Sequence, residues 1–383
     1  MTRPVKMAER LLAELAGTIP AGWGEVIRAV QRALFIPARI WVYDAGDEPQ
    51  PIDREIDPQW WWQVVTSDTA IMTQFDNGAT VWPDTTGDRP TSSASRPSLV
   101  LSMLAALDVH EGHRVLEIGT GTGYHAALLA ARLGDDAVST MEIDTTVAQR
   151  AHANLSAAGY APTMIIGDGG AGYPAGAPYD RIIATASVRP GQVPYPWIAQ
   201  TRPGGIIVSP WGPDYHNGVL ARLVVATDGS ASGALSGNLA FMRLRDQQEP
   251  VCPLDGGEVG DAQDSMTSLW VYEVVGEFSG ALTVGVLVPH CHKIVEDDPE
   301  DAHHHRVRVH DPTTRSWATV DVRRGCTVHP VRQHGPRRLW DEIEQAHAWW
   351  VRHGRPAYTR LGVSVTDTEQ WTWLDHPGQR VII

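Results

Sequence analysis

The chain has 383 residues, more than one average domain, and its composition, 43% hydrophobic and 20% charged, is ordinary for a globular protein. A net charge of −14 argues against nucleic acid as an obligate partner, and no apolar run approaches the length of a membrane span. The N-terminus lacks a signal-peptide pattern and three cysteines cannot all pair, so we expect a reduced, cytoplasmic protein.

The first part of the chain, residues 1–98, is expected to form a helical cap and a substrate loop. Helices are expected over residues 5–16 and 24–34, where they cover a sheet face or, alternatively, bind a peptide. Residues 40–82 show no regular pattern, and residues 85–97 are rich in Thr, Ser, Pro and Gly, which is typical of a loop. Five tryptophans in this part predict a small core, a cleft wall or both: Trp41, Trp60, Trp61, Trp62 and Trp82.

A strand, a glycine turn and a helix follow one another over residues 114–130, RVLEIGTGTGYHAALLA. The turn contains Gly119, Gly121 and Gly123, and apolar residues recur at helical spacing from Tyr124. This arrangement places backbone N–H groups and a helix N-terminus around a ligand. The G-x-G-x-G spacing differs from the G-x-G-x-x-G of NAD-binding proteins, which disfavours an NAD-dependent oxidoreductase.

Further strands in this region end in acidic residues. The second strand, residues 137–144, carries Glu142 near its end, where a carboxylate can accept hydrogen bonds from both hydroxyls of a ribose. A helix over residues 145–158 follows, and a third strand, residues 163–166, precedes Asp168. The remaining strands are expected at 180–185 and 206–209, and a hairpin of 218–227 and 237–245 completes a sheet of about seven strands.

The tail, residues 246–383, is expected to form an α+β extension after a linker at 246–264. Strands are expected at 268–277 and 281–288, hairpins at 306–310 with 316–322 and at 363–366 with 370–374, and a helix at 338–353. The three cysteines, Cys252, Cys291 and Cys326, lie in this tail without the pair spacing of structural zinc sites. We therefore expect no bound metal. The alternative is that Cys291 and Cys326 each supply part of a zinc site.

Several segments together resemble a class I S-adenosylmethionine methyltransferase. They are E-x-G-T-G-T-G-Y from Glu117, the strand end at Glu142, G-D-G-x-x-G-Y from Gly167, Y-D-x-I-I-x-T-A from Tyr179 and R-P-G-G-x-x-V-x-P-x-G from Arg202. More narrowly, the serine two residues before Pro97 and the segment 33–37 resemble the protein-L-isoaspartate O-methyltransferase family. The similarity covers residues 24–245, although Arg243 stands where the family usually has a proline.

The resemblance implies an α/β fold: a Rossmann-like sheet of about seven strands with helices on both faces, plus the C-terminal extension. It divides the chain into a cap (residues 1–98), a cofactor-binding catalytic domain (99–245) and a tail (246–383) for recognition of a substrate peptide or for capping the sheet. S-adenosylmethionine is then expected to contact Ser93, Pro97, Ser98, Glu117, Gly119, Thr120, Gly121, Thr122, Gly123, Tyr124, Glu142, Ile143, Asp168, Gly169 and Thr185. Ser95 is expected to be catalytic, with Ser95, Arg96 and Trp211 on the substrate side; ordinary loop chemistry is the alternative for Ser95.

Methyl transfer to a carboxylate needs no strong general base, because the nucleophile is already ionised at neutral pH. The C-terminally extended relatives methylate an aspartate side chain in a constrained, ribosomally made peptide, and the product becomes an aspartimide or isoaspartate. The resemblance therefore predicts maturation of a modified precursor peptide by a monomer or weak dimer, without nucleic acid or membrane. The alternatives are general isoaspartyl repair and a non-enzymatic, cofactor-sensing scaffold.

Overall fold

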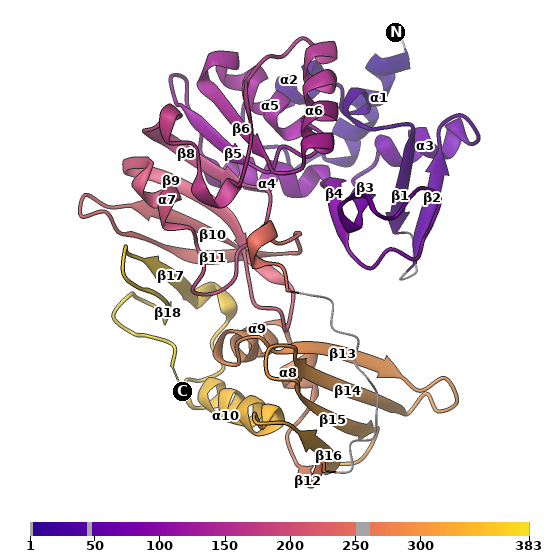
Figure 1. Ribbon diagram of the computed structural model, residues 1–383, viewed down its shortest axis with the longest axis vertical. Coiled ribbons are helices and arrows are strands. Elements are labelled where there is room, and N and C mark those ends of the chain that lie inside the picture. Colours follow the sequence, from indigo (N-terminus) through magenta and orange to yellow (C-terminus); the bar gives the residue numbers. More distant parts are fainter. Residues whose placement is uncertain (1–2, 44–47, 250–260, 383) are drawn as a thin grey trace.

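The computed structural model describes residues 3–43, 48–249 and 261–382, and three sheets organise this part of the chain (Figure 1). The central sheet has nine strands in the order β18-β17-β11-β10-β9-β8-β5-β6-β7. Its parallel half contains β5 (Val115–Ile118), β6 (Val138–Glu142), β7 (Thr163–Ile166), β8 (Tyr179–Ala184) and β9 (Thr201–Trp211). Its antiparallel half contains β10 (Gly218–Val225), β11 (Ala231–Leu239), β17 (Leu361–Val365) and β18 (Gln370–Leu374).

Helices cover both faces of the central sheet. One face packs against α1 (Arg3–Glu14), α2 (Gly24–Ala29), α4 (Pro97–Leu107), α5 (Tyr124–Leu133) and α6 (Thr145–Ala158). The other packs against α7 (Tyr195–Ala199) and against two helices of the tail, α9 (Phe278–Leu287) and α10 (Leu339–Arg352). The α/β fold expected from the sequence is confirmed, although the sheet has nine strands because the last hairpin, β17 and β18, joins β11.

The tryptophan-rich N-terminal segment forms a second, four-stranded antiparallel sheet, which corrects the expectation of irregular structure and a loop. Its order is β2-β1-β3-β4, with β1 (Arg39–Tyr43), β2 (Pro49–Asp53), β3 (Ile71–Phe75) and β4 (Pro90–Ala94). Trp61 of α3 (Pro58–Val65) is fully buried against this sheet, so these aromatics build a core. These strands are difficult to predict from the sequence because they are short and two of them begin at a proline. Proline is tolerated there because β2 and β4 are the edge strands of the sheet.

The tail contributes a third sheet, which stands beside α8 (Tyr272–Val275), α9 and α10 at the lower end of the molecule (Figure 1). Its order is β12-β16-β15-β14-β13. The strands are β12 (Gln263–Thr267), β13 (His292–Asp297), β14 (His304–Asp311), β15 (Ser316–Arg323) and β16 (His329–His334). The expected hairpin of β14 and β15 and the expected helix α10 are confirmed. The linker expected at 246–264 lies mostly outside the described residues.

Two segments of the tail differ from the expectation. Residues 268–277 and 281–288 were expected as strands, but they hold helices α8 and α9. Helix α9 is buried on most sides, so it shows no 3.6-residue period that would distinguish it from a buried strand. Its glycines permit close packing, since a Cβ on Gly285 would lie 2.5 Å from Pro213 Cγ.

Two other elements have different bounds from those expected. The second helix ends at Ala29 and is followed by a short 3₁₀ helix, Arg32–Phe35. Strand β11 begins at Ala231, directly after the turn, and ends at Leu239. Residues 240–245 therefore lie outside the sheet and are available to the functional site.

Within residues 3–43, 48–249 and 261–382, no helix combines the length and apolar character that crossing a bilayer requires.

The tail and the central sheet share one core, so damage to the tail should destabilise both. Trp350 of α10 is 4% exposed, packs in the core of the central sheet and donates from Nε1 to Pro356 O at 3.0 Å. We expect Trp350→Ala to lower the free energy of unfolding by about 3–5 kcal/mol, measured by urea denaturation. Trp270→Ala, at a side chain that is 66% exposed, is the matched control and should change it little. An unchanged midpoint in Trp350→Ala would show that the tail is energetically independent.

Candidate functional site

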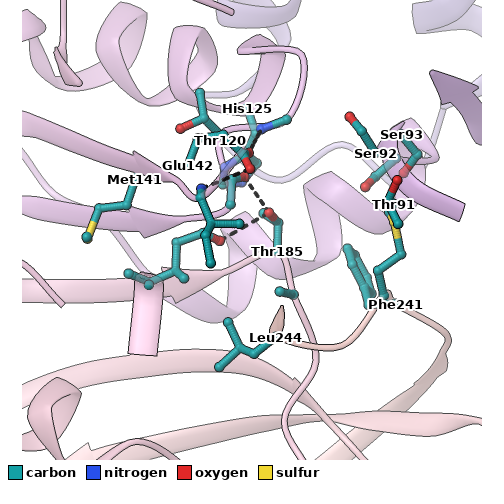
Figure 2. Close-up of a pocket in the computed structure, with 18 of the residues that line it drawn as sticks. Thr91, Ser92, Ser93, Thr120, His125, Met141, Glu142, Thr185, Phe241 and Leu244 are labelled. Carbon is teal, nitrogen blue, oxygen red and sulfur yellow. Dashed lines mark hydrogen bonds between the residues drawn. The ribbon is translucent and has the colours of Figure 1, made fainter. Parts of the chain in front are cut away.

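A cavity lies at the carboxyl ends of β5, β6 and β8, where the strand order reverses on the two sides of β5. Open α/β sheets bind ligands at this point. Side chains from the glycine turn, the end of β6, strand β4 and the segment 241–245 converge on it (Figure 2). The cavity therefore brings together residues that are far apart in the sequence.

The glycine turn needs its glycines for two physical reasons. Gly119, Gly121 and Gly123 have φ values of +93°, +55° and +88°, which other residues rarely adopt. A Cβ on Gly119 would also lie 2.6 Å from Oγ1 of Thr185. The Thr185 hydroxyl donates to Gly119 O at 2.6 Å and thereby joins the turn to the end of β8.

Glu142 presents a largely buried carboxylate at the end of β6. Its Oε2 accepts from the backbone N–H of Gly121 at 2.9 Å, and its Oε1 accepts from those of Ile143 and Asp144 at 3.0 and 3.1 Å. Burial raises the pKa of this carboxyl above its usual value, although the backbone N–H groups oppose the shift. The carboxylate is therefore held in place while it still lines the cavity.

Asp168 and Gly169 form the opposite part of the wall, after β7. Asp168 accepts from the N–H of Gly170 at 2.9 Å, and the indole of Trp197 donates to Gly169 O at 2.8 Å. A Cβ on Gly169 would lie 2.3 Å from Ile118 Cγ2, so only glycine fits here. The backbone at this position can thus face a flat ligand closely.

Beneath the turn lies a polar network that the sequence did not predict. Glu117 is fully buried, and its carboxylate accepts from Thr140 Oγ1 at 2.5 Å and pairs with His125 Nδ1 at 2.5 Å. Thr120 joins through a 2.7 Å bond between its hydroxyl and that of Thr140. Glu117 therefore supports the cavity floor without lining the cavity. The signal for His125 was its position eight residues after Glu117, in the first turn of α5.

The serine segment of β4 lies between this cavity and a second, wider cleft. Ser93 and Ser95 line both spaces, and Arg32 fixes the segment by donating from Nη2 to Ala94 O and Ser95 O at 3.4 and 3.2 Å. Burial lowers the pKa of Arg32 to about 10, which leaves it charged at neutral pH. Arg32 is a second residue that sequence reasoning missed, because the carbonyls it binds are distant in the chain.

The wider cleft has a volume of about 1060 Å³ and lies between the serine segment and the third sheet. The tail supplies His292, His310 and Pro312 to its lining. The segment 240–243, which follows β11, lies on the boundary, with Phe241, Met242 and Arg243 lining both spaces. The two spaces therefore adjoin each other at these shared residues.

Most of the site residues predicted from the sequence lie around the inner cavity. Ser93, Ser95, Gly119, Thr120, Gly121, Thr122, Tyr124, Glu142, Ile143, Asp168, Gly169 and Thr185 line the inner cavity. Arg96 and Ser98 line the wider cleft only, and Gly123 and Pro97 line neither space. Trp211 is a correction: it is fully buried at the end of β9 among core residues, so it cannot contact a substrate.

Comparisons with known proteins agree with this geometry. The family model for protein-L-isoaspartate(D-aspartate) O-methyltransferase matches residues 24–249. Protein-L-isoaspartate O-methyltransferase 1 of Archaeoglobus fulgidus is 46% identical over 208 residues, 54% of this chain and 78% of that protein. The protein-L-isoaspartate O-methyltransferase of Ignicoccus hospitalis is 40% identical over 137 residues, 35% of this chain. In that match the chain spans 64% of the relative's length.

A solved structure extends the likeness to the tail. It is a protein-L-isoaspartate O-methyltransferase with a TM-score of 0.53 and 18% identity, and the alignment covers 97% of this chain and 100% of that one. At this identity the likeness shows a shared fold. The arrangement of the tail is therefore not confined to this chain.

Proposed function

Because the chain belongs to the protein-L-isoaspartate O-methyltransferase family, we propose that it methylates an aspartyl or isoaspartyl carboxylate of a peptide with S-adenosylmethionine. The observation that carries the proposal is that Ser93 and Ser95 line both spaces. The inner cavity offers a cofactor site, and the cleft offers a route for a polypeptide. A methyl group and a carboxylate can meet at their junction.

The inner cavity suits this cofactor on the chemistry of its wall. The Glu142 carboxylate would accept hydrogen bonds from the ribose hydroxyls, and Asp168 with the Gly169 backbone would contact the adenine. The glycine turn lets backbone N–H groups approach the ligand, because Gly121 carries no Cβ there. S-adenosylmethionine, when bound, supplies an electrophilic methyl group on a sulfonium.

The chain's own residues then need only to position the acceptor. The Ser95 hydroxyl lines the junction and would donate a hydrogen bond to the acceptor carboxyl or to the peptide beside it. The apolar side chains of Met103, Met141 and Phe241 exclude water from the inner cavity. Positioning alone can supply a large rate factor, since oriented intramolecular reactions reach effective molarities on the order of 10⁵ M.

The finer proposal concerns the acceptor. We propose an aspartate side chain in a constrained, ribosomally made peptide, whose methyl ester loses methanol when the next backbone nitrogen attacks it and closes an aspartimide. The volume of the cleft, about 1060 Å³, and the tail residues in its wall support a large acceptor. General isoaspartyl repair is the second candidate, because the tail fold also occurs in a solved protein-L-isoaspartate O-methyltransferase.

The cofactor site is tested by Glu142→Gln. We expect S-adenosylhomocysteine to bind more weakly by about 1.5–3 kcal/mol in isothermal titration calorimetry, as for loss of a charge-assisted hydrogen bond. Glu25→Gln, at an exposed residue of α2, removes the same charge elsewhere and should bind normally.

The same pair of variants has a pH signature. The ionised carboxylate accepts the ribose hydrogen bonds, and burial raises its pKa, so affinity should be full above that raised pKa and should fall as pH decreases through it. The decline should begin at a higher pH than an ordinary glutamate would give. The Glu142→Gln variant should not show this decline in affinity. An affinity in Glu142→Gln equal to that of the wild type at neutral pH would remove Glu142 from the site.

The substrate side is tested by Ser95→Ala. Loss of the orienting hydroxyl should lower peptide turnover about tenfold or more, while cofactor affinity stays within about threefold. Ser156→Ala, on the exposed side of α6, is the matched control. Weaker cofactor binding with normal turnover per bound cofactor would move Ser95 to the cofactor side.

The two acceptor classes are separated by comparing kcat/KM for a macrocyclic aspartyl peptide and a linear isoaspartyl hexapeptide. The finer proposal expects the macrocycle to be preferred by about tenfold or more, since binding energy gained away from the reacting carboxyl can be used at the transition state. Equal or faster methylation of the linear peptide would favour general repair.

A further inference from the structure

The lining of the wider cleft is positively charged, although the whole chain has a net charge of −14. Among the residues that the structure describes, the lining contains four arginines, two carboxylates and no lysine: Arg89, Arg96, Arg189, Arg243, Asp214 and Glu249. With the histidines neutral, the lining carries an excess of two positive charges. A local charge opposite to that of the molecule indicates the charge of the ligand that the cleft accepts.

Two of the arginines neutralise both carboxylates. Arg189 pairs with Asp214 at 2.9 Å and with Glu249 at 2.9 Å, and Arg243 pairs with Asp214 at 3.2 Å. His292 also binds Glu249, at 2.7 Å. Although Asp214, Glu249 and His292 lie close enough to hold a cation, both carboxylates already have guanidinium partners, so we assign no metal there.

The other two arginines have no carboxylate partner among the described residues. Arg89 donates from Nη1 to Gln248 Oε1 at 3.3 Å and from Nη2 to Glu249 O at 2.7 Å, and both acceptors are uncharged. The exposed side chain of Arg96 makes no hydrogen bond or ion pair within the part of the chain that the structure describes. Both guanidinium groups thus retain uncompensated charge toward the cleft.

The two arginines bracket strand β4, one just before its start and the other just after Ser95. They are seven positions apart, which corresponds to about 23 Å of extended backbone. Groups so far apart do not converge on one compact anion such as a phosphate. They match two separate carboxylates along an extended chain that runs beside β4.

The opposite wall offers groups suited to a peptide backbone. The side-chain amides of Asn217 and Asn238 line the cleft and make no hydrogen bond within the described residues. An amide can donate to and accept from the main chain of a bound peptide. The cleft therefore combines uncharged groups for a backbone with two separated cations for side chains.

We propose that Arg89 and Arg96 select acidic peptides, binding carboxylates that flank the residue placed at Ser95. This inference rests on the proposed function for the identity of the acceptor and adds the class of peptide that the enzyme prefers. The flanking carboxylates contact the arginines, and the acceptor carboxylate contacts the uncharged serine.

The test measures binding and methyl transfer separately. Fluorescein-labelled isoaspartyl peptides that are long enough to span both arginines carry either Glu or Gln at all flanking positions. Their affinity for the full-length protein with S-adenosylhomocysteine is measured by fluorescence anisotropy. We expect the Glu peptide to bind about tenfold more tightly at low salt and the difference to shrink as salt is added.

Variants assign the preference to the two arginines. Arg96→Gln, at a side chain with no hydrogen bond or ion pair to the described residues, should reduce the preference severalfold, and Arg89→Gln with Arg96→Gln should remove it. Arg96→Glu should shift the preference toward a Lys-flanked peptide. Arg150→Gln, on the exposed side of α6, makes the same charge change outside the cleft and should keep the preference.

The outcomes distinguish this inference from the proposed function. Equal affinity for the Glu and Gln peptides, or a preference that survives the double substitution, would overturn the inference even if both peptides are methylated. A tighter Glu peptide in the wild type, lost in the double variant, would support it whether or not methyl transfer is seen. Failure to methylate any aspartyl or isoaspartyl peptide would count against the proposed function instead.

Discussion

The functional site depends on one buried carboxylate, that of Glu117. A carboxylate with no solvent exposure is very costly unless hydrogen bonds satisfy it, and here His125 and Thr140 do so. These three residues belong to β5, α5 and β6, the elements that meet around the glycine turn. The network therefore fixes the spacing of strand, helix and turn, and Glu142 and Thr185 can then hold the turn from two sides. Figure 2 shows His125, Thr120, Glu142 and Thr185 close together around the turn.

The tail has a comparable effect on the cleft. Its last hairpin pairs β17 with β11 in the central sheet, and Trp349 and Trp350 pack into the same core. The third sheet packs against α10, which also packs in the core of the central sheet, so core contacts join the two sheets (Figure 1). Arg243 binds Ser187, Val188, Pro213 and Asp214 and so stabilises the wall of the cleft.

Sequence patterns predicted the parallel half of the sheet well, because βα units combine short apolar strands, glycine turns and helices with distinct signals. Sequence patterns failed where an element lacks a regular alternation of apolar and polar residues. Helix α9 is apolar on nearly every side, and β4 is a short strand in a polar, proline-containing segment. The site was predictable where its residues follow strand ends, as Glu142 and Asp168 do. The roles of Arg32 and of the segment after β11 were not predictable from the sequence, because only tertiary packing brings these residues to the serine segment.

The distribution of charge along the two spaces is compatible with the proposed methyl transfer. A carboxylate and a sulfonium become a neutral ester and a neutral thioether, so charge disappears as the reaction proceeds. A free cation beside the reacting carboxylate would stabilise the ground state more than the transition state and would slow the step. The junction accordingly presents Ser93 and Ser95, and the arginine that lines it, Arg243, already has its donors engaged. The uncompensated guanidinium groups lie along the cleft, where binding a flanking carboxylate strengthens substrate and transition state alike. Such uniform binding lowers KM without slowing the chemical step, so a charged cleft is compatible with a neutral reaction centre.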